Sequence, residues 1–338
     1  PLNVSKLRHT SVLSDAFVNS ASIAGYQQLD DFNRDDREGL GYYHVTQANG
    51  QRCSTAKGYL AQAKHRNNLT VLTRVAAEKV LLKEGRAIGV QVREKSVVNR
   101  DFAKSEVILC GGAINSPQLL MLSGIGPRAE LEEKGIFVQQ DLPGVGQNLQ
   151  DHLEIYVQHE SKTSDTLYGL FNNPFLKVFS GIQWFLSKKG LLAHSHLELG
   201  GFVKSDARFD HPNIQLHFFP ALVINHGLTN PDRHAFQFHA SPNRPTSRGW
   251  VKLRSSNPEE DPAIQFNYLE TEEDRLQMRD CVKIARNIFS QKSFQHYAGK
   301  ELRPGKNVQD NDVLDEIIRD TSEKIYRLLV PLSFPDDK

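Results

Sequence analysis

The sequence has few cysteines, no excess of charge of either sign and no long apolar run. Its three cysteines, Cys53, Cys110 and Cys281, are far apart and fit no metal-ligand spacing. Such a sparse, odd number favours a reducing compartment. The 41 Lys and Arg residues nearly balance 40 Asp and Glu residues, so nothing indicates a nucleic-acid partner or a strongly basic membrane patch. No apolar run reaches the roughly 20 residues that span a bilayer.

What is present is the composition of a globular protein large enough for two domains. The chain has 338 residues, of which 39% are hydrophobic and 24% charged. It begins at Pro1 without a basic segment followed by an apolar one. The presence of a targeting segment further upstream therefore stays open.

The first 150 residues predict a partial α/β domain. Ser14 is placed to cap a helix over 15–24, which Gly25 ends, and a loop follows at 30–41. Strands are predicted at 68–72 and 87–92.

A Gly-Gly pair follows the most apolar short run of this region. The run 106–110 predicts a strand buried on both faces, and Gly111-Gly112 predicts a tight turn after it. Ser116-Pro117 then predicts the start of a helix that ends at Gly124, and Pro127 starts a shorter one. Glycines after a buried strand let a ligand approach the backbone, and a helix N-terminus offers N–H groups to an anion.

After about residue 150 the pattern changes to an α+β arrangement. Phe175, Val178, Phe179, Ile182 and Phe185 have helical spacing, which predicts an amphipathic helix over 174–189. Alternating runs then predict an antiparallel sheet with one buried face. Those runs are 197–203, 214–218, 236–239, 250–253 and 264–267, and further helices are predicted at 272–289 and 312–325.

Two long motifs resemble those of a known enzyme family. Residues 111–126 read GGAINSPQLLMLSGIG and residues 142–153 read LPGVGQNLQDHL. Both resemble signatures of the glucose–methanol–choline (GMC) oxidoreductases, most closely its choline-oxidising members. Shorter matches extend the resemblance over residues 10–326, including those at 52–60, 68–71, 198–202, 212–215 and 247–249.

The resemblance implies a fold class, domains and a cofactor. It implies a partial FAD-binding α/β domain over 1–150 and an α+β substrate domain over 151–300. Residues 301–326 would return towards the FAD domain, and 327–338 resemble nothing in the family. The cofactor would be FAD, with Ala77, Cys110, Gly111 and Gly112 at its adenosine end.

Two parts of the family pattern are missing. No G-x-G-x-x-G opens the chain, so the unit that would bind the FAD pyrophosphate is expected upstream. The family's Tyr-His-Pro, whose His is the base, is matched only at Tyr326, which Arg327 follows. No catalytic residue is therefore assigned, and the chain by itself is expected to be inactive.

On the substrate side the resemblance points to Glu198. In the family a Glu at this place faces the trimethylammonium group of choline, and that contact is worth on the order of a few kcal/mol in a partly dry pocket. The implied reaction is oxidation of choline to betaine aldehyde, with hydride transfer to flavin, in betaine synthesis. An uncharged alcohol as substrate and a non-catalytic truncated product are the alternatives.

The histidines suggest two further roles. His194, His196 and Glu198 alternate and could share one face as a metal trio, although the family uses flavin without a metal. Three such residues also alternate often by chance, and no metal site is assigned. His152 is expected to tie down its loop rather than to act as a base.

The resemblance also implies partners and a location. An electron acceptor such as a quinone is expected, and membrane association is compatible with the family but not encoded in any recognised segment. The expected location is the mitochondrial inner membrane or matrix in an animal, and the inner membrane or cytoplasm in a bacterium.

Overall fold

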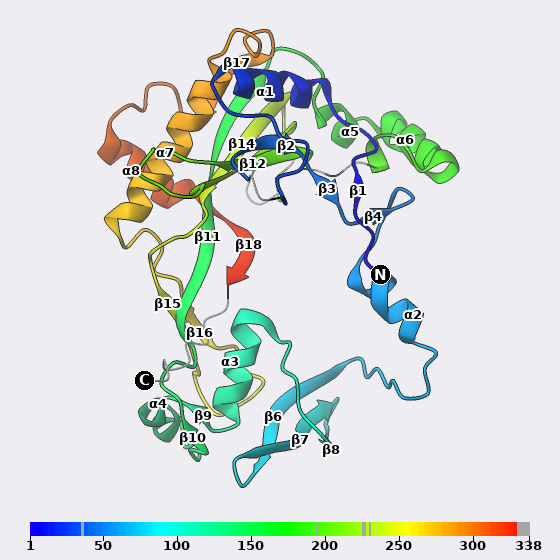
Figure 1. Cartoon of the computed structure of the whole chain (residues 1–338), viewed down its shortest axis with the longest axis vertical. Coiled ribbons are helices and arrows are strands. Elements are labelled where there is room, and N and C mark those ends of the chain that lie inside the picture. The colour runs from blue at the N-terminus through cyan, green and yellow to red at the C-terminus, as the bar shows by residue number, and fades with distance from the viewer. Residues whose placement is uncertain (35–36, 194, 196, 225–227, 230, 330–338) are drawn as a thin grey trace. The chain divides into compact units, whose positions relative to one another are not determined.

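The computed structural model describes residues 1–34, 37–193, 195, 197–224, 228–229 and 231–329 (Figure 1). Their contacts group the chain into two compact units. Of the described residues, unit 1 contains those within 1–69, 153–244 and 272–324, and unit 2 contains those within 70–152, 245–271 and 325–329.

The units are interleaved in sequence, whereas the sequence analysis expected contiguous domains. One boundary between the units lies at residues 152–153. Residues 1–69, however, group with the antiparallel sheet formed later in the chain. Tyr43 N–H donates to the Glu198 carbonyl (2.9 Å), and Glu38 forms an isolated parallel β-bridge with Phe202. The assignment of cofactor and substrate to the expected domains stays a prediction.

Unit 1 is built on an antiparallel sheet in the order β12-β13-β14-β11, with β17 also paired to β11. Phe238 of β14 pairs with Phe218 of β13 on one side and with Val157 of β11 on the other. The strands are β1 (Ser5–Lys6), β2 (Gly39–Tyr42), β3 (His44–Val45), β4 (Gln47–Ala48), β5 (Gln51–Arg52), β12 (Leu199–Val203), β13 (Ile214–Phe219), β14 (Ala235–Pro242) and β17 (Ala298–Arg303).

Helices cover this sheet and extend beside it. They are α1 (Val12–Ile23), a π-helix at Ala56–Leu60 leading into α2 (Ala61–Ala63), α5 (Tyr168–Asn172), α6 (Pro174–Ser187), a 3-10 turn at Leu191–Ala193, α7 (Glu272–Phe289) and α8 (Asn311–Thr321). Two strands run through both units, β11 (Gln147–Ser161) and β18 (Glu323–Leu329). None of the helices in the described segments has the length and apolar character that a membrane span requires.

An aromatic cluster forms the core between α1, α7 and the sheet. The ring of Phe17 stacks on Phe218, with centroids 4.7 Å apart, and lies 5.5 Å from Phe238. Phe236 lies 5.4 Å from Phe289 of α7. All five side chains are at most 4% exposed, so each contributes a large apolar area to folding.

The prediction of one buried face is wrong for the two central strands. Every residue of β13 and β14 is buried, because the polar side chains of the second face are also covered. Gln158 Nε2 donates to Gln237 Oε1 (3.0 Å), and the same oxygen accepts from Val223 N–H (2.9 Å). The second face is thus buried as a hydrogen-bonded layer.

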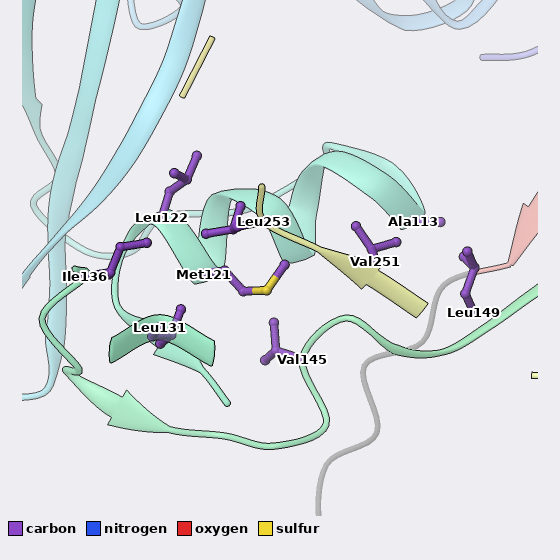
Figure 2. Close-up of a cluster of buried hydrophobic side chains, with 9 residues drawn as sticks. All are labelled: Ala113, Met121, Leu122, Leu131, Ile136, Val145, Leu149, Val251 and Leu253. Atoms are coloured by element: carbon purple, nitrogen blue, oxygen red, sulfur yellow. The ribbon is translucent and has the colours of Figure 1, made fainter. Parts of the chain in front are cut away.

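Unit 2 combines a hairpin sheet with a small helical core. Its elements are β6 (Val75–Lys83), β7 (Arg86–Glu94), β8 (Val97–Phe102), α3 (Gly112–Leu122), β9 (Ile125–Gly126), α4 (Arg128–Glu133), β10 (Gln140–Asp141), β15 (Gly249–Lys252) and β16 (Ala263–Gln265). Figure 2 shows side chains of α3, α4 and β15 converging around Met121, with Leu131, Val145 and Val251 beside it.

Most predicted elements of the second half are confirmed, and several of the first half are shifted. Ser11, not Ser14, caps α1, since its Oγ accepts from Ser14 N–H (3.2 Å). No strand forms at 68–72, and the hairpin begins at Val75. α3 begins at Gly112, so Pro117 lies inside it.

The predicted buried strand 106–110 is also wrong. No strand is assigned there, and Ile108 is 73% exposed. A strand of an open parallel sheet needs neighbours on both sides. The described residues place none beside this segment, so its apolar composition alone cannot make it a strand.

We predict that Phe218→Ala lowers the free energy of unfolding by about 3–5 kcal/mol, because it leaves a cavity in the aromatic cluster. The matched control is Phe175→Ala, whose side chain is 85% exposed, and it should change stability by about 0.5 kcal/mol or less. Urea denaturation followed by circular dichroism measures both. Equal effects of the two substitutions would contradict this account of the core.

Candidate functional site

A cavity in unit 2 gathers most of the residues predicted to contact the cofactor. It measures about 480 Å³, a volume in the range of small-molecule sites. Ala77, Cys110 and Gly111 all line it, together with Asn115 and Ser116 of α3. Gly112 is not part of the lining. Ala77, which is distant in sequence from the pair Cys110-Gly111, thus lines the same cavity as that pair.

The wall formed by 107–110 carries backbone groups suited to a ligand. No backbone hydrogen bond engages the N–H or C=O groups of these four residues within the described parts of the chain. Exposed peptide groups of this kind can bind the edge of a heterocycle, as unpaired strand edges bind other chains. Cys110 is exposed and Ala77 presents only a methyl group, so neither side chain blocks the approach.

The turn that follows explains the need for glycine. Gly112 has φ = +73°, in the left-handed region that other residues rarely adopt. Gly111 is the N-cap of α3 and has no side chain to bond the first N–H groups of the helix. The N-terminal end of α3 therefore presents backbone donors and a positive partial charge next to the cavity.

Glu198, the predicted substrate contact, is completely buried in unit 1. Its Oε2 accepts from Ser11 N–H (2.8 Å) and from Ser11 Oγ–H (3.2 Å). Ser11 is the N-cap of α1, so the carboxylate lies where the helix dipole favours negative charge. Burial, with Asp15 and then Glu198 nearby, raises the pKa of the Tyr42 hydroxyl. A contact of Glu198 with substrate stays a prediction.

A second buried polar group, which the sequence analysis did not identify, lies on the hydrogen-bonded face of the sheet in unit 1. His239 Nδ1 lies 3.1 Å from Glu154 Oε2, and Gln237 Nε2 lies 2.6 Å from His239 Nε2. The Gln237 oxygen is already an acceptor, so its amide nitrogen donates to His239 Nε2. The imidazole proton is then on Nδ1 and bonds Glu154.

Tyr156 completes this group. Its hydroxyl lies 3.0 Å from Glu154 Oε1 and 2.8 Å from Glu323 Oε2. Burial, followed by the charges of Glu154 and Glu323, raises the pKa of Tyr156, so the phenol remains protonated. The signal in the sequence was the alternation Glu154-x-Tyr156-x-Gln158, which is polar where a buried strand is normally apolar.

The histidines of the metal hypothesis are His194 and His196, which lie outside the described residues. Among the described residues no group of three His, Cys, Asp or Glu side chains could hold a metal ion. His152 lies within strand β11 rather than in a loop, and its backbone N–H donates to Asp151 Oδ1 (2.9 Å), while Asp151 Oδ2 accepts from Tyr268. The expected role of its side chain stays a prediction.

Comparison with known proteins shows the family. Two models described as GMC oxidoreductase match residues 1–154 and 245–328. The chain belongs to the GMC oxidoreductase family.

Among its relatives, the oxygen-dependent choline dehydrogenase of Photobacterium profundum is 43% identical over 93% of this chain and 55% of its own length. The mitochondrial choline dehydrogenase of Homo sapiens is 44% identical over 96% of this chain and 55% of its own length. The chain therefore spans about half the length of the curated relatives it matches.

Solved structures show the same fold at lower identity. Formate oxidase superimposes with a TM-score of 0.89 at 22% identity, over 97% of this chain and 62% of the other. Pyridoxine 4-oxidase from Mesorbium loti gives 0.82 at 24% identity, over 97% and 60%. These structures confirm the fold class drawn from the sequence, and the family models and relatives confirm the family resemblance.

We predict that Ser11→Ala lowers the free energy of unfolding by about 1–3 kcal/mol, because it removes the N-cap of α1 and one donor to a buried carboxylate. Ser22→Ala, an exposed serine of the same helix, is the control and should cost about 0.5 kcal/mol or less. Thermal and urea unfolding provide the comparison. If both serines prove equally dispensable, the Ser11–Glu198 contact contributes no stability.

Proposed function

We propose that the protein carrying this chain oxidises choline to betaine aldehyde and uses FAD as cofactor. The supporting observation is the 43–44% identity, over 93–96% of the chain, to relatives named choline dehydrogenases. Bound FAD supplies the acceptor for the hydride that leaves the alcohol carbon. The chain's own residues would bind the cofactor and the cation of the substrate.

The cavity of unit 2 is the proposed site for the adenosine end of FAD. Its lining offers the backbone of 107–110, the small side chain of Ala77 and Gly111, after which the chain turns at Gly112. Peptide N–H and C=O groups can pair with the adenine edge, and glycines permit close approach. The N-terminal end of α3 adds donors that favour an anionic group of the cofactor.

Glu198 is the proposed carboxylate for the substrate cation. A buried carboxylate attracts a quaternary ammonium group more strongly than an exposed one, because water screens the charge less. The bonds from Ser11 hold Oε2 in one orientation. No residue of the chain is proposed as the base, since Arg327 follows Tyr326 where the family has His.

The acceptor of the electrons and the location extend this proposal. We propose a quinone-type acceptor and, by analogy with the name of the human relative, a mitochondrial protein if the source is an animal. A bacterial source would instead place the protein at the inner membrane or in the cytoplasm.

Filling the cavity tests the cofactor site. Ala77→Leu should weaken FAD binding at least about tenfold, because the longer side chain occupies space beside the backbone of 107–110. Val97→Leu on β8, outside the cavity lining, is the control. Quenching of flavin fluorescence on titration gives the dissociation constants. Equal FAD affinities of the two variants would contradict the proposal that the adenosine end of FAD binds in this cavity.

Neutralising Glu198 tests the substrate. Glu198→Gln should lower kcat/KM for choline by about 100-fold, equivalent to roughly 3 kcal/mol, through loss of the charge. Turnover of 3,3-dimethylbutan-1-ol, which has the shape of choline without its charge, should change much less. Ser11→Ala, which leaves the carboxylate in place, should preserve the preference for choline.

The comparison separates the alternatives. A parallel loss on both alcohols would indicate that Glu198 acts only on α1 and would favour an uncharged alcohol as the natural substrate.

A further inference from the structure

The peptide groups of Val223 are held by two buried glutamine side chains. Gln158 Nε2–H donates to the Val223 carbonyl (3.0 Å), and Val223 N–H donates to Gln237 Oε1 (2.9 Å). Gln158 Nε2 also donates to Gln237 Oε1 (3.0 Å), so the two amides are joined to each other. Together they offer Val223 one donor and one acceptor, as a neighbouring strand would. Segment 220–224, which follows β13, is thus attached to the hydrogen-bonded face of the sheet.

The hydrogen bonds permit only one orientation of the Gln237 amide. A backbone N–H can only donate, so the Gln237 atom that faces Val223 is the oxygen. The amide nitrogen then donates to His239 Nε2 (2.6 Å), on the strand that carries Gln237 itself. Gln158 and Gln237 are 3% and 0% exposed, so bulk water does not compete for these bonds.

Segment 220–224 is connected to the chain beside Glu198 by a small apolar cluster. Val223 and Leu197 both pack against this cluster. The buried members of the cluster are Leu167, Phe219 and Ala221. Leu197 directly precedes Glu198 in the sequence. The position of the chain on this side of Glu198 therefore depends on a cluster that Val223 helps to hold.

Other contacts hold Glu198 at its side chain, its carbonyl and the residue that follows it. Ser11 N–H donates to Oε2 (2.8 Å), and Tyr43 N–H donates to the carbonyl (2.9 Å). Leu199 pairs with Phe218 in the sheet. The cluster adds a contact at the preceding residue, so the carboxylate is fixed from both directions along the chain.

We propose that Gln158 and Gln237 are positioning residues for the proposed substrate carboxylate, Glu198. By fixing Val223 they hold the cluster against which Leu197 packs. The inference rests on the proposed function of Glu198. Attraction between a carboxylate and a cation falls with distance and with the access of water. A small displacement of Glu198 therefore weakens binding of a charged alcohol more than binding of an uncharged one.

Gln237→Met tests the first step on the chain itself. Methionine is flexible and about as long as glutamine, but it offers Val223 N–H no strong acceptor. Hydrogen exchange, followed by mass spectrometry of peptides that contain Val223, should become at least about tenfold faster than in the wild type. Gln158→Met, which leaves the bond from Val223 N–H to Gln237 in place, should accelerate exchange by a smaller factor.

The matched control is Gln277→Met on α7. Gln277 is 4% exposed and is hydrogen-bonded to the side chains of Asn213 and Glu273, so its replacement removes bonds of the same kind. Those bonds do not involve segment 220–224. Exchange at Val223 in this variant should match the wild type. Equal acceleration in the Gln237 and Gln277 variants would show a general loss of stability and would overturn the proposal.

Substrate preference tests the second step on the whole flavoprotein. Gln237→Met should raise KM for choline about tenfold and change kcat and the KM for 3,3-dimethylbutan-1-ol much less. Gln277→Met should keep the wild-type ratio of the two KM values. Circular dichroism checks that each variant is folded. Gln158→Met, with a smaller shift in the same direction, provides the comparison if Gln237→Met does not fold.

The outcomes separate this inference from the proposed function. A wild-type protein that does not prefer choline over the uncharged alcohol would overturn both. A wild-type protein that prefers choline, with the same preference in Gln237→Met, would overturn only the positioning role. Faster exchange at Val223 together with a reduced preference for choline is the result that we expect.

Discussion

A sheet buried on both faces must give most of the polar side chains that it covers a hydrogen-bond partner, and this constraint organises unit 1. On one face of β13 and β14, phenylalanines pack against α1 and α7. On the other, Gln237 and His239 are held in a chain of hydrogen bonds that reaches Glu154. Loss of one member would leave another unsatisfied in a dry environment, at a cost of about 1–3 kcal/mol.

The same constraint explains why the buried carboxylates accept defined hydrogen bonds. Glu198 accepts hydrogen bonds from Ser11, the N-cap of α1. Glu154 is hydrogen-bonded to the Tyr156 hydroxyl and to the His239 imidazole. A buried carboxylate is costly unless donors converge on it. A carboxylate prepared in this way also suits a cationic ligand, since no reorganisation is needed on binding. Stability and the proposed substrate preference thus have one physical origin.

The sequence correctly predicted elements that follow from a local residue pattern. Its predictions were wrong where neighbouring elements determine the secondary structure or the burial. The strand β13 and helix α7 follow from periodicity, and Cys110 and Gly111 follow from a motif. Periodicity cannot tell which side of α6 packs against the rest of unit 1, because apolar residues have the same helical spacing in a buried face and in an exposed one. Nor can an apolar run such as 106–110 form a strand without neighbours. The Glu154–His239 contact joins residues 85 positions apart, and no single-sequence pattern reports it.

The chain belongs to the GMC oxidoreductase family, and the reaction of the whole protein is the claim that needs a direct test. Anaerobic reduction by choline provides it. The protein carrying this chain is saturated with FAD, oxygen is removed, and the visible absorbance of the flavin is followed while choline is added. The account predicts bleaching of the flavin with betaine aldehyde formed in equal amount. Flavin that binds and stays oxidised in excess choline, yet is reduced by an uncharged alcohol, would contradict it.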